Sequence, residues 1–233
     1  MNQSFGYILN RRAYRDTSLL VDVFTEKFGR ICCVARPAKK RGKIVKGNTE
    51  PFRYLYLSWI GKGDVQTLTE ADERGRHNIP ASELMMGLYL NELILLLTRQ
   101  HAPMPELFSA YKYTLHKLGN ADINRQVLMR FEIYLLNCLG YPLGIDHSEA
   151  NSMNSNEFYH FSLNDGLILD LTQNSVNQSN KPVNTLISKE LLLALHDIQN
   201  MQESHWIELR AFLDKVYSAI SPRNINSRKY LSF

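Results

Sequence analysis

A dense run of basic side chains is the first feature of this sequence that could do chemistry. Between residues 27 and 48 the chain carries eight Lys and Arg residues and no acidic residue. Cations at this density displace the counterions that surround a phosphate backbone, so the run predicts contact with nucleic acid. The residues predicted to bind DNA in this run are Arg36, Lys39, Lys40, Arg41, Lys43 and Lys46.

The uneven placement of charge along the chain supports this interpretation. The net charge is +4, but residues 1–47 carry eleven basic and three acidic residues, whereas the remainder carries sixteen basic and twenty acidic residues. Such an asymmetry indicates a polyanionic partner for the N-terminal part. Arg11, Arg12 and Arg15, at the end of the first expected strand, extend the predicted DNA-binding patch. The alternative is that the run is only a solvated loop rich in lysine.

The elements that must position these cations are short strands. Apolar residues alternate with small or polar ones in residues 5–12, 19–25, 30–35, 52–60 and 65–70, which is the pattern of half-buried strands. Five short strands in about 70 residues fit an OB-type barrel, although an SH3-like barrel would give much the same pattern. On the fourth strand, Tyr54 and Tyr56 offer rings for base stacking, and Trp59 fits the interior as well as the surface.

Beyond residue 80 the period of the apolar residues changes from two to 3.6, which favours helices. A linker is expected over residues 74–80, then a helix capped by Ser82, a helix from Pro105 to Gly119 and a helix capped by Asp122. Residues 158–163 and 167–171 predict a small hairpin between polar loops, and two helices follow near residues 188–200 and 204–220.

The sequence therefore predicts an α+β multidomain protein. A five-stranded OB-type β-barrel is expected over residues 1–79, and an all-helical domain with a loop and β-hairpin insertion near residues 148–184 is expected over residues 80–233.

Residues suited to catalysis or metal binding are scattered. The sequence has no glycine-rich phosphate loop, no G-x-S-x-G motif and no H-E-x-x-H motif. His147 lies near Asp146 and Glu149, but a metal site needs at least three convergent ligands, and neighbours in one loop are weak evidence for them. An unrecognised hydrolase or transferase would have to rely on such groups. We therefore predict that the protein is not an enzyme and binds no cofactor or metal.

Cysteine usage and hydropathy predict the compartment. Three cysteines, of which Cys32 and Cys33 are adjacent, form neither a disulfide framework nor a four-cysteine zinc site. The N-terminus does not have the pattern of a signal peptide, and no apolar stretch has the length of a membrane span. We expect a soluble protein of the reducing cytoplasm that does not contact a membrane.

Short segments along nearly the whole chain resemble the bacterial RecO family of recombination mediators. The matching segments are GYILNRRAYRDTSLLVDVFTEKFGR, VARPAKK, EPF with GKGDVQTL, MGLYLNELI with PELF, MRFEIYLLNCLGY and NINSRKYL. The resemblance implies an OB domain followed by a helical domain, binding and annealing of single-stranded DNA, and association with the bacterial nucleoid during repair. It also implies partnership with RecR and docking to the C-terminal tail of the single-stranded-DNA-binding protein, so that RecA can load.

The chain departs from the family pattern in one respect. Many relatives hold a zinc ion with four cysteines after the LGY motif, but here no cysteine follows Cys138. The zinc subdomain is therefore absent or replaced by the polar loops and hairpin, and we predict no metal in this region.

The partner tail that the resemblance implies is acidic and ends in an apolar residue with a free carboxylate. Its site needs an apolar slot edged by cations, preferably arginines whose planar fork fits a carboxylate. The residues predicted for this site are Lys117, Arg125, Arg130, Phe131 and Tyr134. The alternatives are that Arg130 and Glu132 are surface charges, or that Arg130 pairs with a buried carboxylate such as Glu92.

A second interpretation of the basic barrel is an RNA-binding OB-fold factor of translation or transcription. Such a factor would need a group that recognises the 2′-hydroxyl, and this interpretation leaves the large helical half unexplained. Comparing the binding of single-stranded DNA, duplex DNA and RNA separates the two interpretations.

Overall fold

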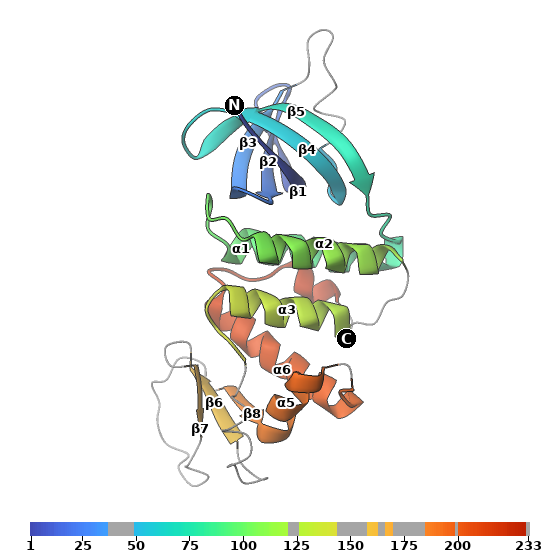
Figure 1. Ribbon diagram of the computed structural model, residues 1–233, viewed down its shortest axis with the longest axis vertical. Coiled ribbons are helices and arrows are strands. Elements are labelled where there is room, and N and C mark those ends of the chain that lie inside the picture. Colours follow the sequence, from blue (N-terminus) through green and yellow to red (C-terminus); the bar gives the residue numbers. More distant parts are fainter. Residues whose placement is uncertain are drawn as a thin grey trace. The chain divides into compact units, whose positions relative to one another are not determined.

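The structure, a computed structural model, describes residues 1–36, 49–120, 126–143, 158–162, 166–169, 185–198 and 200–231 (Figure 1). The chain packs as two compact units. The first unit contains Met1–Leu128 together with Ile225–Phe233, and the second contains Met129–Asn224. The division of the chain into a barrel domain of residues 1–79 and a helical domain of residues 80–233 stays a prediction.

The first unit is built on a closed barrel of five strands. They are β1 (Asn2–Tyr14), β2 (Ser18–Thr25), β3 (Gly29–Ala35), β4 (Arg53–Ile60) and β5 (Val65–Arg76). Their order around the barrel is β1-β2-β3-β5-β4, and all pairs are antiparallel except β3 with β5. This arrangement confirms the predicted OB-type barrel.

Alternation along the strands fills the barrel with apolar side chains. On β4, Leu55, Leu57 and Trp59 are buried in the interior, so Trp59 is a core residue. The interior is completed by Ile8, Val21, Val23, Ile31, Cys33, Ala35, Leu68 and Ala71. Because successive side chains of a strand point to opposite faces, Tyr54 and Tyr56 lie on the outer face of β4.

β5 is longer than the sequence predicts. The polar residues 74–76, which we predicted to begin a linker, continue β5, because Arg76 pairs with Arg53 and Gly75 with Tyr54 on the neighbouring strand. The register shifts between Tyr54 and Leu55. Polar side chains are tolerated here since this end of β5 lies at the surface, and cross-strand hydrogen bonding therefore overrides the weak apolar pattern.

Two helices pack against the barrel. A single 3-10 turn, η2 (Ala81–Glu83), leads into α1 (Leu84–Leu97), and α2 spans Pro105–Gly119 as predicted. The predicted cap by Ser82 is wrong, because Ser82 lies within the 3-10 turn and Glu83 precedes α1 without a side-chain cap.

The contact between α2 and the barrel is aromatic. The ring of Phe108 lies 5.6 Å from that of Tyr7 and 5.5 Å from that of Phe24, and Tyr111 also contacts both rings. The buried Asn91 of α1 links the same layers, since its amide donates to the carbonyl of Leu9 and its oxygen accepts from the Tyr111 hydroxyl at 2.5 Å. Asn91, which interrupts the apolar pattern of α1, thus joins β1 and α2 through buried hydrogen bonds.

The C-terminal segment completes the first unit. The 3-10 helix η4 (Ser227–Tyr230) packs on α1. The carboxylate of Glu92 accepts the backbone N–H groups of Asn226 and Ser227 at 2.9 and 2.7 Å and also accepts the Ser227 hydroxyl. Arg228 donates to the Tyr89 hydroxyl at 2.8 Å.

The second unit combines helices with a small sheet. Its helices are most of α3 (Gln126–Cys138), α5 (Lys189–Ala194), the 3-10 helix η3 (Leu195–Asp197) and α6 (Glu203–Ile220). The predicted hairpin is present as β6 (Phe158–Ser162) and β7 (Gly166–Leu169), and a third strand, β8 (Thr185–Ser188), gives the order β7-β6-β8. The expected cap at Asp122 lies outside the described residues.

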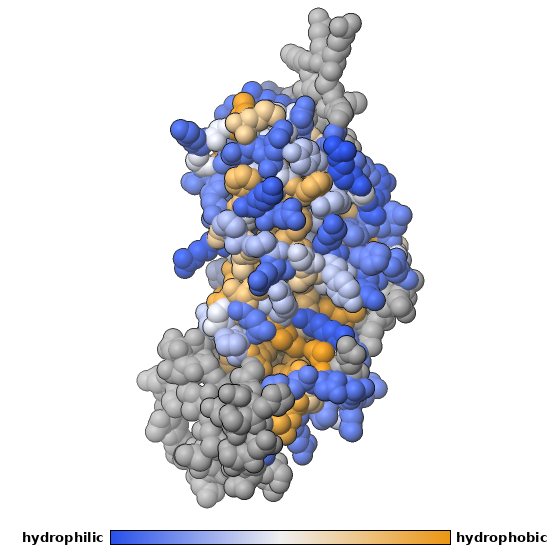
Figure 2. Space-filling view, viewed as in Figure 1, coloured by the Kyte–Doolittle hydropathy of each residue, from blue (hydrophilic) through white to orange (hydrophobic). Residues whose placement is uncertain are grey.

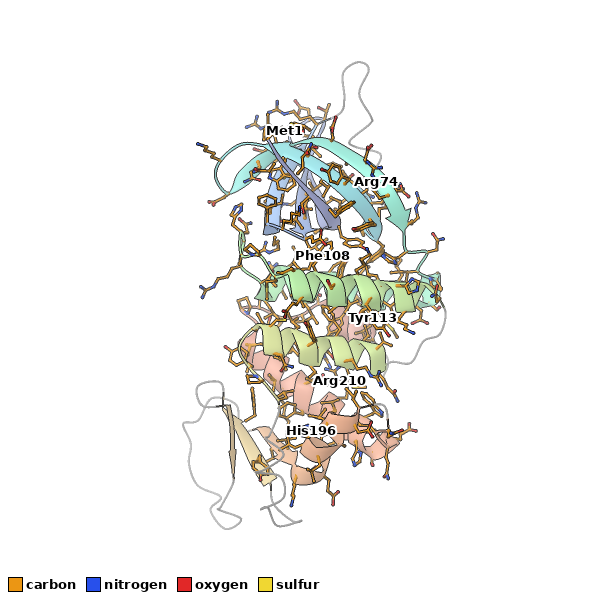
Figure 3. The ribbon with its side chains drawn as sticks, viewed as in Figure 1. Met1, Arg74, Phe108, Tyr113, His196 and Arg210 are labelled. Carbon is orange, nitrogen blue, oxygen red and sulfur yellow. The ribbon has the colours of Figure 1, made fainter. Side chains whose placement is uncertain are left out.

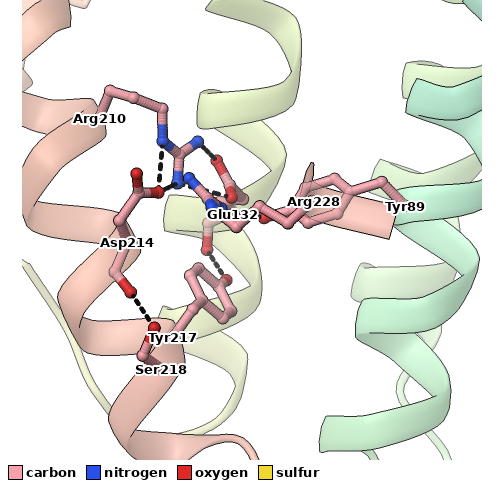
Figure 4. Close-up of polar contacts among 7 residues, drawn as sticks. All are labelled: Tyr89, Glu132, Arg210, Asp214, Tyr217, Ser218 and Arg228. Carbon is pink, nitrogen blue, oxygen red and sulfur yellow. Dashed lines mark hydrogen bonds and ion pairs between the residues drawn. The ribbon is translucent and has the colours of Figure 1, made fainter. Parts of the chain in front are cut away.

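A buried ion pair joins α3 to α6 in this unit (Figure 4). The fully buried carboxylate of Glu132 receives two hydrogen bonds from the guanidinium of Arg210, at 2.6 and 3.1 Å, and the Arg210 side chain is only 10% exposed. Tyr217 donates to the Glu132 carbonyl at 2.7 Å. Asp214, one turn further along α6, binds the other side of the guanidinium. The interpretation of Glu132 as a surface charge is therefore wrong.

We predict that Glu132→Ala destabilises the protein by about 3 kcal/mol, because it leaves a buried guanidinium with only a partly exposed partner. Urea unfolding followed by the helical circular dichroism signal measures the change. Asp214→Ala is the matched control and should cost less than about 1 kcal/mol, since that carboxylate is 42% exposed. An equal loss of unfolding free energy in the two variants would contradict the prediction that the buried carboxylate matters more than the exposed one.

Candidate nucleic-acid interface

The β1–β2 turn and the end of β3 bring predicted DNA-binding residues together. Arg12 pairs with Leu20 across β1 and β2, and Leu20 pairs with Val34 across β2 and β3. Arg15 lies in the β1–β2 turn, and Arg36 directly follows β3. Arg12, Arg15 and Arg36 are all exposed. Residues distant in the sequence therefore place three cations at one end of the barrel, which we name the β1–β3 end.

The predicted DNA-binding residues of the basic run begin at this same end. Arg36 is the first of them and the last residue described before the gap at 37–48. The other five predicted residues of the run, Lys39, Lys40, Arg41, Lys43 and Lys46, lie outside the described residues. The chain thus leaves β3 at the end of the barrel that also carries Arg12 and Arg15.

Local contacts hold the arginines of the β1–β3 end in different ways. The Arg15 guanidinium lies 5.2 Å from the centre of the Tyr14 ring, and Arg15 has a positive φ of 53°. Arg11, by contrast, forms an ion pair with Glu50, with 2.6 Å between Nη1 and Oε1. A phosphate that contacts Arg11 must therefore compete with a carboxylate, whereas stacking orients the charge of Arg15 without neutralising it.

An apolar patch lies beneath these cations on the outside of the barrel. Leu20, Cys32 and Val34 are buried there, and Tyr14 packs against them. Burial is the main cause that raises the pKa of the Cys32 thiol, and the negative charge of Asp22 adds to it. Cys32 therefore acts as a small apolar residue, and its strand neighbour Cys33 points into the core, as expected for adjacent strand residues.

The aromatic residues of β4 are less available for stacking than the sequence suggests. Phe52 is buried. The Tyr54 ring stacks on Phe5 at 5.0 Å, and the ammonium of Lys112 lies 4.0 Å from the Tyr54 ring centre. Tyr56 contacts Phe5 edge-on and lies near the guanidinium of Arg74, 5.8 Å from its ring centre. These rings form a ladder on the outer face of β1 and β4.

The residues predicted for the partner tail are distributed over both units. Lys117 lies on α2 in the first unit, and Arg125 lies outside the described residues. In the second unit, Arg130 donates to the Ile198 carbonyl at 3.1 Å, Phe131 is buried, and Tyr134 is 36% exposed. The predicted pairing partner Glu92 binds the C-terminal segment in the first unit. Arg130 and Tyr134 thus remain the accessible candidates on α3.

Groups for metal or acid–base chemistry are dispersed in the part of the chain that the structure describes. Within those residues, no three His, Cys, Asp or Glu side chains lie close enough to hold a metal ion. His205 belongs to the N-terminal cap of α6, where its ring accepts from the Gln202 N–H at 3.4 Å, and His196 is exposed. His147 lies outside the described residues. No helix among the described residues is long and apolar enough to span a bilayer.

Comparisons with known proteins point to the same family over most of the chain. The family model described as "Recombination protein O N terminal" matches residues 1–74, and that described as "Recombination protein O C terminal" matches residues 81–229. A protein of Glaesserella parasuis named DNA repair protein RecO is 35% identical over 192 residues, which cover 80% of this chain and 77% of that protein. A protein of the same name from Nitrosococcus oceani is 37% identical over 171 residues, covering 72% and 70%.

We predict that the purified protein contains less than stoichiometric zinc and keeps its fold in a chelator. The three cysteines are Cys32 and Cys33 of the barrel and Cys138 of α3, and they are too few and too dispersed for a four-cysteine site. A structural zinc contributes about 10 kcal/mol or more of apparent binding energy, so its removal would unfold the region that it holds. Elemental analysis that finds one zinc per chain would overturn this prediction.

Proposed function

The chain belongs to the RecO family of DNA repair proteins, and on that premise we propose that it binds and anneals single-stranded DNA and acts as a recombination mediator. The observation that carries the proposal is the β1–β3 end of the barrel, which holds Arg12, Arg15 and Arg36, the last of these being the first predicted DNA-binding residue of the basic run. An OB barrel with a cationic edge fits a single strand, whose phosphates are accessible along one side.

Binding of a strand at this surface, and its annealing to a complementary strand, need only electrostatics. Cations at the β1–β3 end offset the charge of phosphates and release counterions. When the phosphates of a bound DNA strand are offset by protein cations, this strand repels a second DNA strand less. Complementary bases of the two strands therefore meet more often. We propose that no covalent step takes place and that the protein works without a catalytic site or cofactor.

The mediator role requires partners, which we propose from the family. They are RecR, the C-terminal tail of the single-stranded-DNA-binding protein and, indirectly, RecA, which would load onto the DNA as the coating protein is displaced. The site of action would be the bacterial cytoplasm, at the nucleoid during repair.

For the acidic tail we propose a site around α3 of the second unit. Arg130 is partly exposed, and one of its guanidinium nitrogens is engaged by the Ile198 carbonyl, which orients the remaining donors. Tyr134 lies one turn further along the same helix and is exposed. A cation beside an accessible ring suits a peptide that ends in an apolar residue and a carboxylate. The roles of Lys117 and Arg125 in tail binding stay predictions.

We predict that replacing Lys39, Lys40, Arg41 and Lys43 together by Ala weakens single-strand binding more than tenfold. If about five phosphates are neutralised, log K should fall against log salt with a slope of roughly −3 to −4 for the unmodified protein and less steeply for the variant. Fluorescence anisotropy with single-stranded DNA, duplex DNA and RNA measures both quantities and tests the RNA alternative.

The matched control is Glu50→Gln, which frees Arg11 from its ion pair. It should tighten binding a few-fold, because one more cation becomes available to phosphate. A salt slope that stays the same in the alanine variant would show that the basic run does not bind the strand.

We predict that Arg130→Glu abolishes binding of an acidic tail peptide while single-stranded DNA still binds, because attraction at the site becomes repulsion between like charges. Isothermal titration with the peptide and anisotropy with DNA measure the two events. Lys215→Glu, an exposed charge reversal on α6, is the control and should leave both unchanged. Normal peptide binding by a folded Arg130→Glu variant would place the tail site elsewhere.

A further inference from the structure

The exposed side of α2 carries a row of basic and aromatic side chains that lie outside the predicted DNA-binding residues. Lys112, Tyr113 and His116 are exposed and Lys117 is partly exposed, and Lys112 with His116 and Tyr113 with Lys117 form two pairs one helical turn apart. The one acidic residue of α2, Glu106, is in its first turn. We name the row the α2 face. Surface helices usually mix both signs of charge, so an acid-free row of this kind indicates an anionic partner.

Within the α2 face, Tyr113 lies apart from the packed side of the helix, whereas Lys112 lies at the border with the barrel, its ammonium 4.0 Å from the centre of the Tyr54 ring. Phe108 points towards the barrel, while Tyr113 lies on the opposite side of α2 (Figure 3). Tyr113 is 59% exposed, and the ammonium of Lys117 lies 5.6 Å from its ring centre. A large exposed ring beside a cation is the combination with which single-strand binders stack a base and contact its phosphate.

The end of β5 continues this positive surface. The His77 ring lies 6.4 Å from that of His116, and Arg76 next to it is exposed. The neighbouring carboxylate of Glu73 binds Arg76 at 3.0 Å and also binds Arg53, so two cations share one acid. Asp72 pairs with Arg74 at 3.6 Å. Each of these two carboxylates, Glu73 and Asp72, is therefore paired with at least one arginine. The face of the first unit visible in Figure 2 is mainly hydrophilic, as a wet interface requires.

His77 is partly buried beside basic neighbours. Its pKa is lowered to about 4, first by burial and then by the electrostatic effect of His116 and Lys112. Its ring nitrogen is paired with the Tyr7 hydroxyl at 2.9 Å, which fixes it against the barrel. His77 therefore stays neutral at physiological pH and leaves Lys112 and its neighbours as the charges that an anion meets.

We propose that the α2 face binds a second single strand of DNA, with Lys112 and Lys117 on its phosphates and a base stacked on Tyr113. This inference rests on the proposed annealing function, because annealing needs two strands held by one protein. The first strand would use the β1–β3 end, which is built from the β1–β2 turn and β3, whereas the second would use α2 and the end of β5. Separate elements allow both strands to be held at once.

Counting bound strands tests the proposal directly. We expect the unmodified protein to bind two short oligothymidylates of about eight nucleotides per chain. The variant Lys112→Glu/Tyr113→Ala should bind one, with the affinity of the remaining strand changed less than about twofold. Its rate of annealing two complementary oligonucleotides should fall on the order of tenfold, since a phosphate contact and a stacking platform are both lost.

Two further variants separate the role of this surface from effects on folding. Lys112→Arg/Tyr113→Phe keeps the charge and the ring and should anneal at the rate of the unmodified protein. Lys215→Glu on α6 carries the same charge reversal and should also anneal normally. Circular dichroism checks that Lys112→Glu/Tyr113→Ala is folded, because Lys112 also contacts the Tyr54 ring.

The outcomes distinguish this inference from the proposed function. An unmodified protein that binds no oligothymidylate would overturn both. Binding of one strand per chain, or normal annealing by Lys112→Glu/Tyr113→Ala, would overturn the second site and leave the first strand-binding surface intact. If that variant anneals normally but no longer binds an acidic tail peptide, the α2 face belongs to a protein partner and not to DNA.

Discussion

The covering of the barrel by α2 is the contact on which the rest of the first unit depends. A closed barrel has no open sheet edge, but apolar side chains on its outer face must still be removed from water. Tyr7 and Phe24 point outward from β1 and β2 and are fully buried, because Phe108 and Tyr111 of α2 pack on them. This contact closes one side of the barrel and leaves the β1–β2 turn and the end of β3 accessible.

The same contact gives α2 two different sides. The apolar stripe of α2 packs against the barrel and α1. The residues of α2 outside this stripe are therefore free to be polar or charged. Elsewhere in the first unit several arginines are already paired, as in Arg11 with Glu50 and Arg53 with Glu73. In the second unit, Arg210 is committed to Glu132 inside the protein. Charge counted along the sequence therefore overstates what a polyanion can meet, and pairing decides which cations remain available.

Sequence periodicity predicted the elements whose pattern arises from their own residues. The five strands alternate with period two because one side of each fills the barrel, and α2 shows its buried stripe and its Pro105 start plainly. The C-terminal end of β5 has the composition of a linker, since its polar residues are placed by pairing with β4 and carry no apolar signal. The strand β8 was missed for a related reason, because it is four residues long and is defined by its partner β6.

The candidate site was predictable only in part. The basic run and the arginines of β1 are visible as local charge, and the register that joins Arg12, Arg15 and Arg36 follows once the barrel is assumed. The burial of Glu132 was not predictable, because its partner Arg210 lies 78 residues away and no local pattern connects them. The α2 face was not predictable, since its residues look like ordinary helix surface until the barrel places His77, which directly follows β5, beside His116.

The return of the C-terminal segment to α1 has a consequence for synthesis on the ribosome. The strands of the barrel are complete by residue 76, but the amide groups of Asn226 and Ser227 that bind Glu92 are made about a hundred residues after α2 ends. At translation rates of 5–20 residues per second this delay lasts roughly 5 to 20 s. During that time the surface of α1 that will receive η4 is open to water. Nascent chains therefore present this surface to chaperones long after the barrel itself is able to form.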